Sequence, residues 1–245
     1  MKTVIIVQAR MTSTRLPGKV MKQVLGKSLL QYQIERLQRV KLADEIAIAT
    51  TTNQTDESIV ELCNRLAIAC FRGSEEDVLG RYYEAATTYK ADTVVRVTSD
   101  CPLIDPQVID EVIDCYVKNK SNYDYVSNSL ERTYPRGMDT EVFSFSALQQ
   151  AFWKATAQSD REHVTPFINQ QPARYSLGNV IYCEDCSHHR WTVDTPEDFK
   201  LIQKIIEAIY PRQPNFTLED CLILLKKYPE WYIINSHVSQ KNYDK

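Results

Sequence analysis

The sequence predicts an α/β fold in which helices cover both faces of a mostly parallel sheet. Within residues 1–118, short apolar runs typical of buried strands alternate four times with segments whose apolar residues recur at helical spacing. The chain has 245 residues, of which 43% are hydrophobic and 25% charged, which is ordinary for one globular domain with a sizeable insertion. We therefore expect residues 1–245 to form a single domain.

The first four strands are expected where apolar residues cluster in short runs. Those runs lie at residues 4–7, 45–50, 68–71 and 93–97. The helices between and after them are expected at residues 28–40, 56–67, 74–89 and from 105 onward. Asp56 and Ser74 stand where N-caps are favoured, and Pro106 suits the first position of a helix. Ligands of such sheets bind at the carboxyl ends of the strands, so the loops after these strands should hold the site.

The regular alternation ends near residue 120, and the remainder is expected to add further strands and helices. Strands are expected at residues 124–128, 138–143, 175–182 and 190–193. Helices are expected at residues 145–155, 161–169, 195–209 and from 217 onward. Residues 120–190 thus form an insertion, and residues 195–245 supply C-terminal helices. The polar residues 235–245 are expected to fray.

Glycine is scarce, and its positions exclude two nucleotide-binding turns. The chain has only 6 glycines, at positions 18, 26, 73, 80, 137 and 178. They form no G-x-G-x-x-G, and Met21 stands where the first glycine of a G-x-x-x-x-G-K-[ST] loop would be. Any phosphate loop in this chain must work with fewer glycines than those designs use.

The net charge and the cysteine content further restrict the classes of protein to which the chain can belong. The net charge is −3 and the sequence pI is about 5.9, which disfavours a nucleic-acid binder with a broad basic face. No apolar stretch reaches the roughly 18 residues of a membrane span, and the N-terminal segment lacks the features of a signal peptide. We therefore expect no membrane or nucleic-acid partner, and a cytoplasmic protein whose 7 cysteines are reduced.

The segment after the first expected strand carries most of the functional signal. It reads QARMTSTRLPGK (residues 8–19) and contains the cations Arg10, Arg15 and Lys19 beside three hydroxyl side chains. Cations clustered after a buried strand, next to backbone N–H groups, suit a polyphosphate ligand. A solvated basic loop is the alternative, since short basic runs are common on surfaces. The position at the carboxyl end of a strand favours the ligand site.

This segment and four later strings resemble one family. The pattern A-R-x-x-S-x-R-x-P-x-K is matched by Ala9, Arg10, Ser13, Arg15, Pro17 and Lys19. The later strings are VTSDCPL (97–103), YPRG (134–137), DREHVTP (160–166) and WTVDTPED (191–198). On these strings the chain resembles the sugar-activating cytidylyltransferases, which include the synthetases that couple CMP to acidic sugars. It is most similar to their branch of spore coat polysaccharide biosynthesis proteins F, over residues 1 to about 210.

The resemblance implies a three-layer α/β/α sandwich of the nucleotide-diphospho-sugar transferase fold. It implies transfer of CMP from CTP to a sugar, often acidic, or to a related acceptor, with release of pyrophosphate in surface-glycan biosynthesis. It also implies a Mg²⁺ cofactor and, through residues 120–190, acceptor binding and a homodimer. Phe143, Phe145, Phe152 and Trp153 are candidates for that interface or for the core.

Asp100 and Asp194 are the metal ligands that this resemblance implies. Each follows an expected strand, and a carboxylate there can hold Mg²⁺ against nucleotide phosphates. A turn role for Asp100, and a place before a helix capped by Thr195 for Asp194, are the structural alternatives. Asp198 lies one turn inside that helix and is expected to compensate the helix dipole.

The remaining candidate residues come from loops of the same sheet edge. Arg15, Lys19 and Asp100 are the expected catalytic residues, the two cations stabilising the departing pyrophosphate. The expected nucleotide contacts are Ala9, Arg10, Ser13, Arg15, Lys19, Thr50, Arg72, Gly73, Ser99 and Asp100. The expected acceptor contacts are Arg136, Asp139, Glu141, Arg161 and His163. His163 is a candidate base or a structural histidine.

Two rival functions are compatible with the same fold. A glycosyltransferase would consume a nucleotide sugar, but such enzymes commonly hold metal with an Asp-x-Asp string, and the nearest string here is DTE at residues 139–141. A non-catalytic nucleotide-binding module is the second rival. The joint presence of Arg15, Lys19, Asp100 and Asp194 disfavours it.

The string CEDCSHH (residues 183–189) contains the ligand types of a zinc site. Its four potential ligands fall within this one short segment, whereas tetrahedral sites usually draw on two separated pairs. A surface turn is therefore the favoured interpretation.

Overall fold

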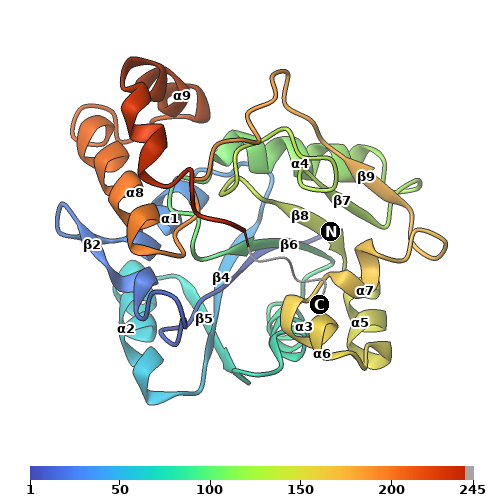
Figure 1. The fold of residues 1–245 in the computed structure, drawn as a ribbon. Helices are drawn as coiled ribbons and strands as arrows, with labels where there is room; N and C mark the ends of the chain where they lie inside the picture. Colours follow the sequence, from blue (N-terminus) through green and yellow to red (C-terminus); the bar gives the residue numbers. More distant parts are fainter. Residues whose placement is uncertain (241–245) are drawn as a thin grey trace.

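The computed structural model describes residues 1–240 and contains a seven-stranded sheet in the order β5-β4-β1-β6-β8-β7-β9 (Figure 1). The strands are β1 (Thr3–Gln8), β4 (Glu45–Thr51), β5 (Ala69–Gly73), β6 (Thr93–Thr98), β7 (Tyr125–Ser127), β8 (Glu141–Ser144) and β9 (Leu177–Asn179). β8 runs antiparallel to both neighbours, and the other pairs are parallel. The mostly parallel sheet predicted from the sequence is thus confirmed, and residues 120–190 extend this same sheet.

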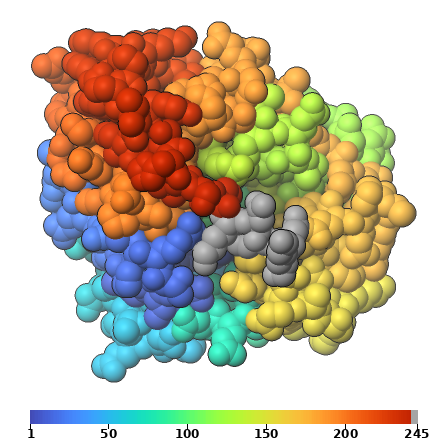
Figure 2. Space-filling view, viewed as in Figure 1, coloured from blue at the N-terminus to red at the C-terminus, as the bar shows by residue number. Residues whose placement is uncertain are grey.

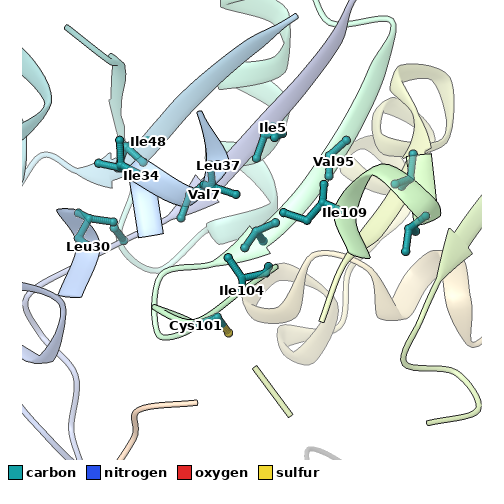
Figure 3. Close-up of a cluster of buried hydrophobic side chains, with 14 of the residues drawn as sticks. Ile5, Val7, Leu30, Ile34, Leu37, Ile48, Val95, Cys101, Ile104 and Ile109 are labelled. Atoms are coloured by element: carbon teal, nitrogen blue, oxygen red, sulfur yellow. The ribbon is translucent and has the colours of Figure 1, made fainter. Parts of the chain in front are cut away.

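Helices cover both faces of the sheet because its central strands are apolar on both sides. Along β1, Ile5 and Val7 pack with α1 (Leu29–Leu37), α2 (Glu57–Leu66) and α4 (Pro106–Lys118) (Figure 3). The alternate residues Val4 and Ile6 pack on the opposite face. The helices of that face are α3 (Val78–Thr88), α5 (Phe145–Lys154), α6 (Gln158–His163) and α7 (Pro166–Asn169). This is the predicted three-layer arrangement.

The C-terminal helices form a separate apolar cluster beside α1. It contains α8 (Pro196–Ile209), α9 (Leu218–Lys227) and the 3-10 helix η3 (Pro229–Ile234), with Tyr134 and Trp191 buried among them. Thr195 and Thr217 cap α8 and α9 through reciprocal hydrogen bonds with the carboxylates three residues later. The short elements η1 (Lys19–Met21), β2 (Gln23–Val24), β3 (Lys27–Ser28) and η2 (Gln54–Asp56) complete the described chain.

One expected helix cap was wrong, and a second occupies the N-cap position without a side-chain capping bond. Asp77, not Ser74, caps α3 by accepting a hydrogen bond from the backbone N–H of Gly80 at 2.9 Å. Asp56 precedes α2, but its side chain makes no capping bond because the carboxylate turns inward toward β4 and the loop after β1.

Several expected boundaries past residue 120 also differ. The helix expected over 161–169 is split, because Val164 adopts a left-handed φ of +73° and Pro166 begins α7 at its first position. The strand expected over 190–193 contributes only an isolated bridge between Arg136 and Arg190. The strand expected over 175–182 shortens to β9.

The expectation of fraying after residue 235 was wrong for its first residue. Asn235 is 2% exposed and its amide makes two hydrogen bonds to the body of the protein. Residues 241–245, also included in that expectation, lie outside the described residues. Among the described residues, no helix is both long and apolar enough to cross a membrane. All seven cysteines carry free thiols.

Candidate active site

A cavity of about 640 Å³ lies at the carboxyl ends of β1 and β6. Because these parallel strands are neighbours, the loop after β1 and the residues after β6 meet at one sheet edge. Figure 2 shows this face, where the N-terminal region in blue, residues near 130 in yellow-green, the 150–170 region in yellow and the C-terminal segment in red converge toward the centre. Segments far apart in the sequence therefore line one cavity.

The loop after β1 is held in place by backbone and carboxylate contacts. Gly18 has a φ of +67° and donates its N–H to the Met11 carbonyl at 2.8 Å, which closes the loop. The backbone N–H of Met11 donates to the buried Asp56 carboxylate at 2.9 Å. Gly18 thus supplies the left-handed conformation that the turn requires.

Lys19 lies between the two predicted metal ligands. Its Nζ is 3.0 Å from Oδ2 of Asp100 and 2.8 Å from Oδ1 of Asp194. Arg15 reaches the same Asp194 oxygen at 2.9 Å. The structure therefore brings together two cations and two carboxylates from distant parts of the sequence; Lys19 and Asp194 alone are 175 positions apart.

The ion pairs shift the proton affinities of this cluster. Burial alone would raise the pKa of Asp100, but the Lys19 ammonium and the Thr98 hydroxyl outweigh it and lower that pKa to about 2. Burial alone would lower the pKa of Lys19, but the carboxylates of Asp100 and Asp194 raise it overall. Lys19 and Asp100 are consequently both charged at neutral pH.

The position between Asp100 and Asp194 suits a cation. A lysine ammonium bridges the two carboxylates here, and carboxylate oxygens are ligands that Mg²⁺ accepts. The part of the chain that the structure describes contains no group of three or more His, Cys, Asp or Glu side chains that could hold a metal ion. A divalent ion at this point would therefore take its remaining ligands from water or substrate phosphate.

Several predicted nucleotide contacts line the cavity and three do not. The lining includes Ala9, Arg10, Ser13, Arg15, Lys19, Ser99 and Asp100. Thr50, Arg72 and Gly73 are not among the described residues that line it. The Thr50 hydroxyl is buried and donates to Asp56 at 2.9 Å, and Arg72 folds back to donate to the Thr51 carbonyl at 3.0 Å. These groups secure the end of β4 instead of facing the cavity.

Four of the five predicted acceptor residues also line the cavity. They are Arg136, Asp139, Glu141 and His163. Asp139 pairs with both terminal nitrogens of Arg132, at 2.5 and 2.8 Å. Arg161 is not among the lining residues: it pairs with Asp77, the N-cap of α3, and donates to the Phe152 carbonyl at 2.8 Å. Burial lowers the pKa of His163, so its imidazole is neutral at pH 7.

Glu141 is occupied by neighbours from three other elements. One carboxylate oxygen pairs with Arg96 of β6. The other accepts from the Tyr125 hydroxyl at 2.5 Å and from the Thr165 hydroxyl at 2.7 Å. Its contacts fit a residue that shapes the cavity floor and orients Arg96.

Three arginines are among the cavity-lining residues that the sequence did not predict. Arg81, Arg96, Arg132 and Gln240 line the cavity, and Arg81 is only 2% exposed. Arg81 was detectable, because it interrupts the apolar face of α3 between Val78 and Ala85, and a cation there needs a partner or a ligand. Arg96 carries a similar signal, because it interrupts the apolar run of β6, whereas Arg132 and Gln240 carry none.

The aromatic and cysteine candidates fall into different environments. Phe143 is core, whereas Phe152 stacks on Tyr83 with ring centroids 4.2 Å apart beside the exposed Trp153. Cys183 is exposed and Cys186 is buried. Residues 183–184 form a bend and residues 187–188 form a turn, in agreement with the turn favoured by the sequence.

A family model described as cytidylyltransferase matches residues 4–224. The chain belongs to the cytidylyltransferase family. Its enzyme class, a nucleotidyltransferase, and the branch suggested by the sequence strings are thereby confirmed. The spore coat polysaccharide biosynthesis protein SpsF of Bacillus subtilis is 32% identical, over 92% of this chain and 94% of that protein.

Other relatives of this cytidylyltransferase extend the comparison. The uncharacterized protein MJ1063 of Methanocaldococcus jannaschii is 40% identical over 99% of this chain and 98% of that protein. A solved cytidylyltransferase of Leptospira borgpetersenii superposes with a TM-score of 0.91 at 32% identity, covering 99% and 100% of the two chains. CMP:2-keto-3-deoxy-manno-octonic acid synthetase complexed with CTP has a TM-score of 0.65 at 16% identity, over 85% and 99%, which shows a shared fold.

Proposed function

We propose that this cytidylyltransferase transfers CMP from CTP to a hydroxyl of a sugar or sugar-like acceptor, with release of pyrophosphate, in the biosynthesis of surface glycans. The observation that carries this proposal is the cluster in which Lys19 and Arg15 meet Asp100 and Asp194 at the cavity. Family membership supports CTP as the nucleotide. A relative named for spore coat polysaccharide biosynthesis supports the glycan pathway.

The roles of the chain's own residues follow from charge. Arg15 and Lys19 bind the triphosphate and stabilise the negative charge that builds on the pyrophosphate as it leaves. Ala9 and Ser13 line the same end of the cavity and contribute backbone and hydroxyl donors. Catalysis then depends mainly on positioning and electrostatics, with the acceptor oxygen aligned to the α-phosphate.

Asp100 and Asp194 are the residues that would hold Mg²⁺. The ion, when bound, neutralises phosphate charge. Lys19 must give up its two carboxylate partners when it binds phosphate, so the carboxylates become available as the nucleotide enters. When the nucleotide binds, Arg15 and Lys19 thus pair with phosphate, and Asp100 and Asp194 become free to hold the metal ion.

The part of the cavity lined by Arg136, Asp139, Glu141 and His163, which we term the acceptor end, suits an anionic sugar. Arg136 supplies a guanidinium, a group that binds carboxylates through paired hydrogen bonds, whereas Arg132 already pairs with Asp139. Several relatives are named 3-deoxy-manno-octulosonate cytidylyltransferase, among them a protein of Geobacter metallireducens that is 31% identical over 67% of this chain and 69% of that protein. His163 lines the cavity with a lowered pKa, which supports a role as the base that accepts the proton of an attacking hydroxyl.

A homodimer and a cytoplasmic location complete the proposal. The exposed Trp153, with Phe152 and Tyr83 stacked beside it, is an apolar surface of the kind that subunit contacts cover. CTP is an intracellular metabolite, and free thiols on all seven cysteines suit a reducing compartment. Light scattering, which measures the molar mass in solution, tests whether the protein is a dimer.

Pyrophosphate release is the direct test of the proposed function. The protein is incubated with CTP and Mg²⁺ and offered 3-deoxy-manno-octulosonate, an acylneuraminate, a neutral hexose or a phosphonate. We expect release that depends on one acceptor class and that ATP does not support. An Asp100→Asn variant serves as the inactive control. Transfer from a nucleotide sugar, with no pyrophosphate release from CTP with any acceptor, would contradict the proposal.

A further inference from the structure

Arg190 occupies a junction between the acceptor end of the cavity and the metal-binding carboxylates. It is 6% exposed and lies four residues before Asp194. Its backbone pairs with Arg136: the Arg136 N–H donates to the His189 carbonyl at 3.0 Å, and the Trp191 N–H donates to the Arg136 carbonyl at 2.7 Å. The segment that carries Arg190 is thus tied to the turn at the acceptor end.

The Arg190 guanidinium bridges two carboxylates. It donates to Oδ2 of Asp194 at 2.9 Å and to both oxygens of Asp198, at 2.9 and 3.1 Å. Asp198 is fully buried and also accepts from the backbone N–H of Asp194 at 3.0 Å. With Oδ2 held on this side, Asp194 turns its other oxygen toward Lys19. Arg190 therefore fixes the rotation of the Asp194 carboxylate.

The C-terminal segment completes this arrangement. Asn235 donates to the Arg190 carbonyl at 2.8 Å and to Asp198 Oδ1 at 2.9 Å. Gln240, which lines the cavity, accepts from Arg190 at 2.5 Å. The cytidylyltransferase family model ends at residue 224, so these two contacts come from outside the matched region.

We propose that Arg190 is a positioning residue that presents Asp194 Oδ1 to a divalent cation, and that Asn235 holds Arg190 in place. The inference rests on the proposed function. Partners that orient a metal-binding carboxylate commonly alter metal affinity when they are removed. A guanidinium can serve two carboxylates in one plane, which the point charge of a lysine cannot do.

The first test uses Arg190→Lys, which keeps a positive charge between two buried carboxylates and so preserves folding. CTP binding is measured by calorimetry with and without Mn²⁺, and the gain in CTP affinity on adding Mn²⁺ is the readout. We expect that gain to fall by about 10–100-fold. Metal-free CTP affinity should stay within about twofold, because the phosphate-binding cations Arg15 and Lys19 are unchanged.

The second test asks whether Asn235 itself, and not the C-terminal segment in general, supports metal binding through Arg190. Asn235→Ala should reduce the Mn²⁺-dependent gain about 10-fold, the smaller end of the range for orienting partners. Ser236→Ala is the matched control, since Ser236 is the exposed neighbour, and its gain should equal that of the unsubstituted protein. Equal losses in both variants would overturn the role of Asn235.

A crystal structure of the Arg190→Lys variant provides a readout that does not depend on activity. We expect the Asp194 carboxylate to rotate away from Lys19. An Asp194 oxygen still about 2.8 Å from Lys19, or an unchanged Mn²⁺-dependent gain, would overturn the proposal. Absence of pyrophosphate release by the unsubstituted protein would instead contradict the proposed function, and the crystallographic comparison would still decide the role of Arg190.

Discussion

Asp194 and Glu141 are two carboxylates of one cavity with different kinds of partner. Asp194 pairs with Lys19 and Arg15 from the loop after β1, in addition to Arg190. Glu141 pairs with Arg96 on the neighbouring strand and accepts hydrogen bonds from two hydroxyl groups. Both are largely buried, at 7% residual exposure each.

The difference shows which charged side chains are able to exchange one ion-pair partner for another. The loop cations around Asp194 can turn toward an incoming triphosphate, because a phosphate offers them stronger partners. The partners of Glu141 lie on β6, β7 and the segment before α7, so they have no comparable freedom. If the proposed function holds, we expect the partners of Asp194 to change when a nucleotide binds and the surroundings of Glu141 to stay fixed.

Replacing Lys19 with methionine should give the largest effect. Losing one preorganised cation at the leaving group should lower kcat for pyrophosphate release by about 10²–10³-fold. At the same time, Mn²⁺ binding to the nucleotide-free protein should tighten, because Asp100 and Asp194 lose their shared partner. Kinetics and Mn²⁺ titration check the two changes.

Lys22→Met is the matched control for this substitution. Lys22 lies one turn further along, over the Phe199 ring, and does not line the cavity. A loss of Mn²⁺ affinity in Lys19→Met would contradict the idea that Lys19 competes with a divalent ion for the two carboxylates.

Glu141→Ala tests the fixed surroundings of Glu141 and should act mainly on the stability of the fold. Removing one member of a buried pair leaves Arg96 uncompensated, so the free energy of unfolding should fall by about 3 kcal/mol, measured by urea denaturation. Adding Arg96→Met should recover part of this loss, since the unpaired charge is then gone. A large drop in kcat with unchanged stability would show that Glu141 acts in catalysis.

Gly137→Ala tests the packing of the turn that carries Arg136 against the segment that carries Trp191. Gly137 has a φ of +105°, and an added Cβ would lie 2.7 Å from the backbone carbonyl carbon of Trp191. We expect a loss of about 2 kcal/mol in the free energy of unfolding. Gly26→Ala is the control, because its φ of +78° carries similar strain with nothing within 4 Å. Equal losses would mean that the contact with Trp191 contributes nothing.

The smallest expected effect is a pH dependence of the free energy of unfolding, and it arises from His189. Burial, with a contribution from His188, lowers its pKa from 6.5 to about 4. The unfolded chain therefore takes up a proton first as pH falls through this window, so the free energy of unfolding should decrease between about pH 6.5 and 4. His189→Gln should remove that component, seen by comparing urea denaturation at about pH 7 and pH 5. Identical pH dependence in both proteins would contradict it.

Local patterns predicted much of this molecule. Apolar runs located the strands at residues 3–8, 45–51, 69–73 and 93–98, and the string around Lys19 located the sheet edge where the cavity lies, because apolar runs and charge clusters are local properties of the chain. Prediction was poorer after residue 120, where strands are as short as three residues and take their pairing from partners distant in sequence. The inward turn of Asp56 was likewise invisible, since a capping position and a buried carboxylate have the same local sequence.

The sequence by itself determined the alternation of strands and helices, the cationic loop and the family. These depend on side-chain periodicity and on strings of adjacent residues. Only the tertiary structure decided that Arg161 faces α3, that Thr50 is buried against Asp56, and that Arg190 joins Asp194 to the C-terminal segment. Such contacts join residues of distant segments, and their geometry is set when the helices pack on the sheet.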